Sequence, residues 1–236
     1  MLAAIYGPGL QGGFFFDDEP SILQAEGVRL ERLNAESLRE ALASGRSGPS
    51  GRPVAQLSFA ANHFFSGFDP YAFKVTNLVI HAFCGLLIFL LTLRLLAPQR
   101  WAPPRRHALL FAGLVAVLWL LHPLQLTPVL HVVQRMTSLS ALFLLAAQLL
   151  HVIARERGGG AGAAYLALAW GVLWPLSFFS KETGVLFPLF ALAWELIVRR
   201  SAHGGLDRFA RLLATATALA AVAGVAYGLS PAGRWL

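Results

Sequence analysis

The sequence predicts an all-α, polytopic membrane protein, a helical bundle of about six to seven transmembrane helices. Three observations support this fold class. Of the 236 residues, 56% are hydrophobic and only 13% are charged, whereas soluble domains carry about 25% charged residues. The mean hydropathy is +0.60, and no stretch keeps the alternation of apolar and polar residues typical of a strand. Such a chain has too little polar surface to cover a soluble core, which excludes a cytosolic enzyme.

The net charge of +7 is distributed as topology signals rather than as a patch that binds nucleic acid. Eight of the twelve acidic residues lie in the first 70 residues, interleaved with five arginines, and the later basic residues gather between apolar runs. The single cysteine, Cys84, can form no internal disulfide and matches no metal-ligand spacing. We therefore expect a lipid bilayer around the chain and no nucleic acid partner. Nothing in the sequence fixes the oligomeric state.

Residues 1–16 are predicted as the outer end of a truncated first transmembrane helix. The stretch is apolar, but glycines and Pro8 interrupt it, and it is shorter than the about 17–25 residues that a span needs. It lacks the basic start and the small-residue cleavage site of a signal peptide.

Residues 17–74 are predicted as an extracytoplasmic loop with short amphipathic helices. Asn34 is a typical N-cap for a helix over residues 35–42. Residues 45–51 are rich in glycine, serine and proline, which predicts a loop. Pro53 then begins a second helix over residues 54–65, whose apolar face would lie along the membrane surface.

Residues 75–236 are predicted as the transmembrane helical bundle. Six apolar segments are candidates to cross or enter the bilayer, namely residues 75–97, 108–121, 138–154, 161–179, 185–198 and 209–229. Arginine-rich connections fall on every second loop, as the positive-inside rule expects for the cytoplasmic side. The loops 122–137 and 180–184 and the first 74 residues would therefore face outward.

Three acidic side chains follow the first apolar run, in the order Asp17, Asp18 and Glu19. This position puts carboxylates at the outer membrane interface, where burial can bring a pKa toward the working pH of a general base. A solvated charge cluster at a helix end is the simpler alternative. No spacing argues for a metal site, although the paired carboxylates could also hold a divalent cation.

Two polar residues inside an apolar segment, Asn77 and His81, lie four apart and hence on one face of a helix. Polar groups inside a span must find partners, so they either line a cavity or join helices by hydrogen bonds. Both interpretations stay open.

The outward loop 122–137 contains one arginine, Arg135, against the charge bias of that side. Its guanidinium either binds a phosphate or pairs with an acid such as Asp17. His122 and Gln134 lie in the same loop and are candidates for ligand contact.

The turn 180–184 contains Lys181 and Glu182 between two apolar runs. The two side chains either pair with each other or deliver a cation to an anionic leaving group. Because all the polar candidates are expected on one side of the membrane, they are able to converge on one site.

In their order along the chain, these motifs resemble the GT-C superfamily of membrane glycosyltransferases, and within it the transmembrane-and-tetratricopeptide-repeat type of O-mannosyltransferase and its bacterial relatives. No helical repeat of the tetratricopeptide kind is present, so the likeness concerns the membrane part alone. The matching blocks are Phe16-Asp17-Asp18, Arg52-Pro53 leading to Asn62, Asn77-Leu78-Val79-Ile80-His81, His122-Pro123-Leu124-Gln125, Gln134-Arg135-Met136 and Ser180-Lys181-Glu182-Thr183-Gly184.

The resemblance implies transfer of a sugar from a polyprenyl-phosphate donor to a hydroxyl of an acceptor protein or glycan on the extracytoplasmic face, which is the periplasmic face of the inner membrane for a bacterial member. It implies that Asp18 or Asp17 takes the acceptor proton while the anomeric carbon is inverted. Asp18 is favoured because Asp-Glu is the commoner form in the superfamily. The resemblance assigns the donor phosphate to Arg135, Lys181 and Arg52, with support from Glu182, His122, Gln134, Asn77 and His81.

Two other functions stay open from the sequence. A catalytically silent fragment or scaffold subunit would leave the polar candidates dispersed. A lipid-carrier transporter would place charges at mid-membrane depth and show internal repeats, and no such repeat is visible in the sequence.

Overall fold

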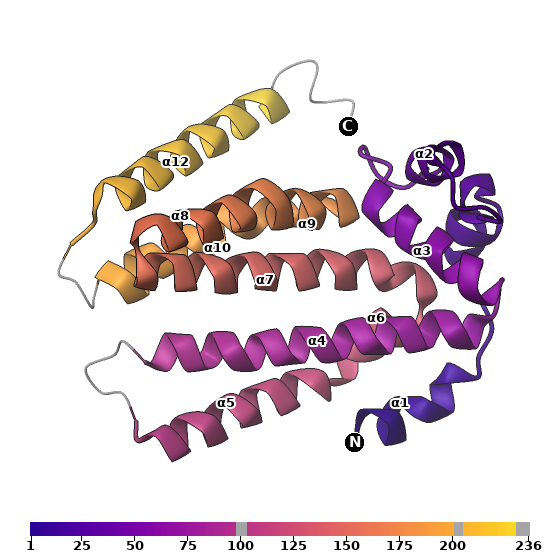
Figure 1. Cartoon of the computed structure of the whole chain (residues 1–236), viewed down its shortest axis with the longest axis horizontal. Coiled ribbons are helices and arrows are strands. Elements are labelled where there is room, and N and C mark those ends of the chain that lie inside the picture. Colours follow the sequence, from indigo (N-terminus) through magenta and orange to yellow (C-terminus); the bar gives the residue numbers. More distant parts are fainter. Residues whose placement is uncertain (98–102, 201–204, 230–236) are drawn as a thin grey trace.

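The computed structural model describes residues 1–97, 103–200 and 205–229 as a helical bundle without strands in those ranges. Two long helices, α4 (Pro70–Leu96) and α7 (Arg135–Arg157), lie side by side at its centre (Figure 1). Helix α5 (Arg105–Leu120) packs on α4. Helices α8 (Gly159–Leu168) and α9 (Trp174–Ser180) run back along α7, joined by the π-helical turn Ala169–Leu173.

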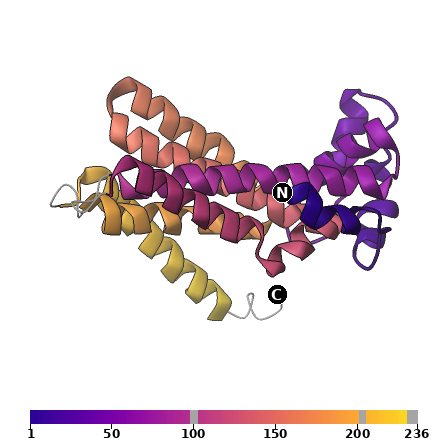
Figure 2. The ribbon, with the colours of Figure 1, turned by 90° about the horizontal axis from the view of Figure 1, so that it is seen from below.

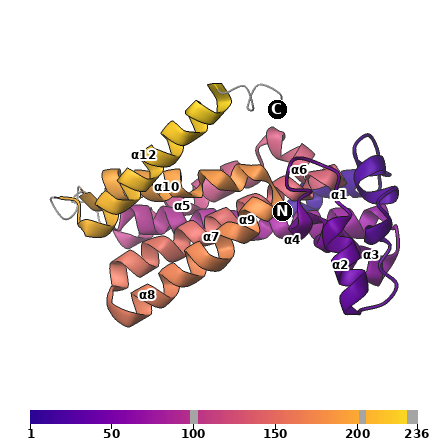
Figure 3. The same cartoon turned by 90° about the horizontal axis from the view of Figure 1, so that it is seen from above.

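The rest of the bundle follows the turn after α9. A 3-10 turn, Glu182–Leu186, leads into α10 (Phe187–Trp194), which continues as the π-helical turn Glu195–Arg199. Helix α12 (Arg208–Leu229) contacts α10. Seen from above, α8 and α12 lie at opposite faces of the bundle (Figure 3).

The prediction of an all-α membrane helical bundle is confirmed. Three helical stretches in the described ranges are long and apolar enough to cross a membrane, namely Pro70–Leu96, Val132–Arg157 and Gly159–Ser180. A fourth is the bent pair Arg105–Leu120 and Pro123–Leu130, whose halves meet at 55°. The spans counted in this way are fewer than the six to seven expected. The predicted segment 185–198 is not among these spans, because α10 has 8 residues and is flanked by 3-10 and π-helical turns. The predicted segment 209–229 folds as α12, which is also not among the spans.

The short helices gather at one end of the bundle and form a cap over it (Figures 1 and 2). The cap contains α1 (Leu2–Leu10), α2 (Ala35–Ala43), α3 (Pro53–Ser66) and two single turns, Glu19–Leu23 and Glu26–Val28. The Asn34 side chain accepts a hydrogen bond from the Ser37 N–H and caps α2, and Pro53 is the first residue of α3, both as the sequence predicts.

Helix α4 begins at Pro70, within the predicted loop 17–74, because Asp69 caps it. The Asp69 carboxylate accepts hydrogen bonds from the backbone N–H groups of Tyr71 and Ala72. The cap is joined to the bundle by a buried apolar cluster that includes Ile22, Phe59, Phe73 and Met136. Burying a side chain of this size stabilises a fold by about 1.5–3 kcal/mol, so the cluster fixes the cap against α4 and α7.

A partly buried network of ion pairs joins helices at the other end of the bundle. Arg155 on α7 forms ion pairs with Glu195 after α10 and with Asp207 before α12. His151, one turn earlier on α7, lies 3.3 Å from the same Glu195 carboxylate. These contacts fix three helices at the end that lies farthest from the cap.

Candidate functional site

A polar cavity of about 330 Å³ lies where the cap meets the first turn of α7. Its walls come from three parts of the chain that are distant in sequence. They are the part of the cap over residues 17–52, the turn at the beginning of α7, and the turn that follows α9. The lining residues are Asp17, Pro20, Ser21, Gln24, Arg46, Ser47, Arg52, Val133, Gln134, Met136 and Lys181.

The cavity is electrically positive. Arg46, Arg52 and Lys181 reach its wall, whereas Asp17 is the single carboxylate among the lining residues. Around them, Ser21, Ser47, Gln24 and Gln134 offer hydroxyl and amide groups. Such a set of cations and neutral donors suits an anion with several oxygen acceptors, as a phosphate group has.

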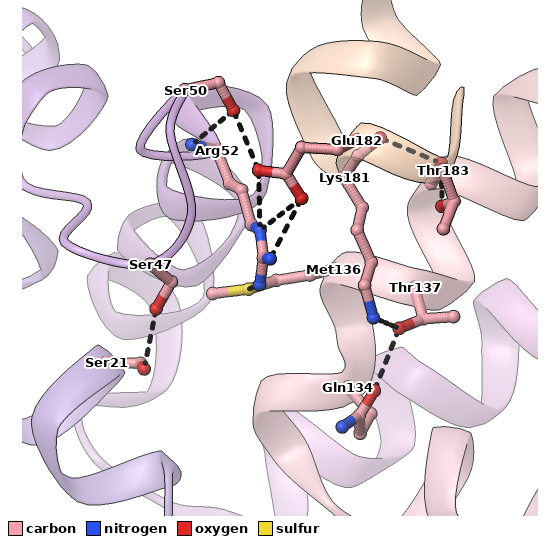
Figure 4. Close-up of polar contacts among 11 residues, drawn as sticks. Ser21, Ser47, Ser50, Arg52, Gln134, Met136, Thr137, Lys181, Glu182 and Thr183 are labelled. Atoms are coloured by element: carbon pink, nitrogen blue, oxygen red, sulfur yellow. Dashed lines mark hydrogen bonds and ion pairs between the residues drawn. The ribbon is translucent and has the colours of Figure 1, made fainter. Parts of the chain in front are cut away.

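Arg52 is fixed with one edge of its guanidinium turned away from Glu182 (Figure 4). Its Nε and Nη2 donate to the Glu182 carboxylate at 3.1 and 2.9 Å, and its Nη1 meets only the Met136 sulfur, at 3.3 Å, among the described contacts. Ser50 donates a further hydrogen bond to Glu182 at 3.3 Å. Burial would raise the pKa of Glu182, but the hydrogen bonds and charge of Arg52 outweigh it and hold that pKa below its ordinary value.

Lys181 reaches the cavity from the turn after α9 (Figure 4). Its Nζ donates to Thr137 Oγ1 at 2.7 Å, and that hydroxyl donates to Gln134 Oε1 at 2.8 Å. An ammonium group has three N–H donors, so the described contacts leave two for a ligand. Burial and the nearby charge of Arg52 lower the pKa of Lys181, against the opposing charge of Glu182. A bound anion would therefore relieve the repulsion between Lys181 and Arg52.

The two adjacent aspartates have different surroundings. Asp17 is exposed and lines the cavity. Asp18 is fully buried, and its carboxylate accepts backbone hydrogen bonds from Phe15 at 3.1 Å and from Val133 at 2.7 Å. The His131 Nε2 lies 3.6 Å from Asp18, too far for a hydrogen bond. This geometry favours Asp17, rather than Asp18 as the resemblance implies, as the carboxylate that a ligand can reach. The two backbone hydrogen bonds of Asp18 hold the loop instead.

Backbone strain coincides with the cavity. Phe16 and Arg52 are the two non-glycine residues with positive φ in the described ranges, at 50° and 54°. One directly precedes Asp17 and the other lines the wall. This conformation costs a residue with a side chain about 1–2 kcal/mol, and such strain is concentrated at functional sites.

Arg135 does not line the cavity, in contrast to the expectation that it binds the donor phosphate. It is fully buried among α3, α4 and α7, and its guanidinium carbon lies 5.0 and 5.1 Å from the ring centroids of Phe59 and Phe73. All five of its N–H donors are used, and they bind uncharged oxygens. The acceptors are Asn77 Oδ1, Asn62 Oδ1, the Phe73 carbonyl, and the carbonyl and hydroxyl of Ser58. Neither Asp17 nor Asp18 pairs with it in the structure.

Three further candidates lie outside the cavity and join helices or cap them. Asn77 accepts from Arg135 and donates to the carbonyls of Val129, His131 and Val132. The His81 Nε2 contacts the Leu120 carbonyl at 3.0 Å, and its ring stacks on Trp119. The His122 Nδ1 accepts from the Leu124 N–H and caps the turn Pro123–Gln125. For Asn77 and His81, the geometry favours interhelical hydrogen bonding.

A divalent cation at Asp17 and Asp18 gains no support from the geometry. Over the described residues, no group of three or more histidine, cysteine, aspartate or glutamate side chains is placed to hold a metal ion. Both Asp18 oxygens already accept backbone hydrogen bonds.

Four polar lining residues are not among the candidates that the sequence indicates: Ser21, Gln24, Arg46 and Ser47. Arg46 could have been identified as a candidate, because it is the single cation in the glycine- and serine-rich stretch 44–51, directly before Arg52. The other three are ordinary loop residues, and only the folding of the cap over α7 brings them to the wall.

Comparison with curated proteins finds protein O-mannosyl-transferases. The mouse Protein O-mannosyl-transferase TMTC3 is 31% identical over 152 residues, which cover 62% of this chain and 15% of the mouse protein. The Caenorhabditis elegans Protein O-mannosyl-transferase F38B6.6 is 26% identical over 212 residues, 86% of this chain and 28% of that protein. The human Protein O-mannosyl-transferase TMTC4 is 32% identical over 143 residues, 57% of this chain and 19% of the human protein.

The chain thus spans between 15% and 28% of the length of these three relatives. No protein-family model and no solved structure matches it. The curated matches named here are all protein O-mannosyl-transferases, the type of protein that the sequence motifs resemble. The chain is distantly similar to a part of each of these protein O-mannosyl-transferases.

Proposed function

We propose that the cavity at the cap is the active site of a membrane glycosyltransferase, which moves a sugar from a polyprenyl-phosphate donor to a hydroxyl of an acceptor protein. The observation that supports this most is the convergence of three cations and one exposed carboxylate on a single cavity of about 330 Å³. That volume is within the range of about 300–1,000 Å³ typical of small-molecule sites. The curated relatives, which are named as protein O-mannosyl-transferases, make mannose the first sugar to test.

The proposed reaction uses the groups on the wall in complementary roles. The Asp17 carboxylate takes the proton of the acceptor hydroxyl, and the hydroxyl oxygen forms a bond to the anomeric carbon from the face opposite the phosphate. The bond between the anomeric carbon and the phosphate oxygen breaks, and its electron pair leaves with the carrier phosphate. Lys181 and Arg52 offset the charge that develops on this leaving group, with Arg46 as a third cation. The product anomer is inverted.

The distribution of arginines supports an extracytoplasmic position for the cavity. Arg94 ends α4, Arg105 and Arg106 begin α5, and Arg155 and Arg157 end α7, all at the end of the bundle opposite the cap. Positive residues mark the cytoplasmic end of membrane helices. The cap would therefore face outward, with the bundle holding the lipid tail beside the site.

The test is sugar transfer by the chain reconstituted in lipid vesicles, with polyprenyl-phosphate mannose as donor and a serine- and threonine-containing peptide as acceptor. We expect transfer by the unaltered chain, and a loss of at least about a hundredfold in Asp17→Asn, since general-base catalysis contributes about 10²–10⁴-fold. Lys181→Ala should lose activity as well, whereas Arg94→Ala, which removes a cation at the other end, should not. No transfer by the correctly inserted chain, or equal transfer by all three variants, would contradict the proposal.

A further inference from the structure

Glu182 is not among the residues that line the cavity. It lies behind Arg52 and offsets part of the positive charge of the lining cations. Its carboxylate holds the Nε and Nη2 edge of Arg52, while Arg52 and Lys181 line the cavity. The side chain is 31% exposed, and its low pKa keeps it ionised at neutral pH. A ligand that binds the Nη1 of Arg52, which contacts the Met136 sulfur and not Glu182, would thus meet a guanidinium already paired on its far side.

The charges around the cavity leave a net charge of +1. The positive groups are Arg46, Arg52 and Lys181, and the negative groups are Asp17 on the wall and Glu182 behind Arg52. A sugar linked to a lipid phosphate is a phosphodiester with one negative charge. The carrier left after transfer is a phosphomonoester, whose charge at neutral pH is about −1.5 to −2 because its second pKa is near 6. The net charge of the site therefore balances the single negative charge of the donor, but it is smaller than the negative charge of the product.

We propose that Glu182 makes the cavity selective for a phosphodiester over a phosphomonoester, so that the donor binds and the spent carrier leaves. The inference rests on the proposed function, because it takes the two esters to be the donor and the product of that reaction. Glu182 is here a specificity-determining residue that acts through Arg52 and does not touch the substrate.

The charge balance holds through the reaction. When Asp17 takes the acceptor proton, the net charge of the site rises to +2 as the leaving carrier gains its second negative charge. The site charge of +2 and the carrier charge of about −2 remain balanced until Asp17 releases that proton to water. The site then returns to +1 against a dianion, and the carrier is bound less tightly. Without Glu182 the site would keep +2 and retain the product.

The test compares two soluble probes, farnesyl phosphate and its methyl diester, by calorimetric titration of the whole chain in detergent micelles at pH 7.5. A charge about 6 Å from the ligand, at an effective dielectric constant of about 40, changes affinity about tenfold for each charge on the ligand. Glu182→Gln should therefore tighten the diester about tenfold and the monoester about a hundredfold, so that the preference shifts about tenfold toward the monoester. At pH 5, where both probes carry about one charge, this shift should vanish.

Two variants separate this effect from a loss of structure. Glu156→Gln removes the same charge from a glutamate that is also paired with an arginine, with 33% exposure, at the other end of the bundle, and it should leave the preference unchanged. Glu182→Asp keeps the charge and should keep the wild-type preference even if both probes bind more weakly. Thermal unfolding of each variant shows that it is folded.

The outcomes distinguish the inference from the proposed function. If both probes bind and Glu182→Gln leaves their affinity ratio unchanged, or weakens both equally, Glu182 only positions Arg52 and the selectivity proposal is overturned. If neither probe binds the unaltered chain, the cavity is not a lipid-phosphate site, and the proposed function fails together with the inference. A tenfold shift at pH 7.5 that is absent at pH 5 supports the proposal.

Discussion

Replacing Arg135 by lysine should destabilise the fold strongly although the charge is kept. The guanidinium uses five N–H donors, on acceptors from α3 and α4, whereas an ammonium has three. At least two hydrogen bonds are therefore lost in a fully buried place. A hydrogen bond to a charged group is worth about 1.5–3 kcal/mol, so we expect a loss of about 3 kcal/mol or more. The contacts of the planar guanidinium with the rings of Phe59 and Phe73 are lost as well.

Thermal unfolding in detergent measures this effect. For a chain of this size, 1 kcal/mol corresponds to about 2–4 °C in Tm, so Arg135→Lys should lower the Tm by about 6–12 °C. Arg94→Lys is the matched control, because Arg94 is 45% exposed and paired with Glu156 on the surface; its Tm should change by about 1–2 °C at most. If both variants unfold at the same temperature, Arg135 does not hold the three helices together and the reasoning is refuted.

Three further predictions concern residues that support the cavity from outside its wall. In Asp18→Asn the amide cannot accept both backbone hydrogen bonds, so the unfolding free energy should fall by about 1–3 kcal/mol; an unchanged Tm would show that Asp18 does not hold the loop. A Cβ on Gly184 would lie 2.5 Å or less from backbone atoms of Ser177 and Phe178, so Gly184→Ala should displace the turn that contains Lys181 and weaken the binding of farnesyl phosphate. Gly171→Ala is the control and should leave binding unchanged, because a Cβ there would meet open space. Because the pKa of Glu182 is lowered in the fold, its pairing with Arg52 stabilises the fold above the unfolded pKa of about 4.3 and is lost as the pH falls through the folded pKa. The Tm difference between the unaltered chain and Glu182→Gln should therefore shrink between pH 6 and pH 3, and a constant difference would contradict this.

The elements of the bundle could be predicted because their signals are local. The apolar run after Lys74 and the cap at Asn34 are readable from neighbouring residues, and the structure has α4 and α2 in those places. The lengths were harder, because helix ends depend on caps such as Asp69 and on turns such as Glu195–Arg199.

The site could be predicted only in part, because its geometry depends on how the cap folds over α7. Lys181 and Arg52 were identified from the sequence and both line the cavity. Asp17 is exposed and Asp18 is buried, a difference between adjacent residues that their positions in the sequence do not reveal. From the residues alone, Arg135 either binds a phosphate or pairs with an acid, and the family resemblance assigns it to the donor phosphate. Its five acceptors belong to residues between 58 and 77, and the sequence does not show that these residues lie close to Arg135.

The most direct test of the account is photolabelling of the chain with a polyprenyl phosphate that carries a diazirine in its first isoprene unit, followed by peptide mapping. The cavity at the cap predicts adducts in the segments that form its wall, residues 17–24, 46–52 and 133–136 and Lys181, and their loss in Lys181→Ala. Adducts confined to the arginine-rich ends of α4, α5 and α7, or labelling unaffected by Lys181→Ala, would contradict the assignment of this cavity to a lipid phosphate.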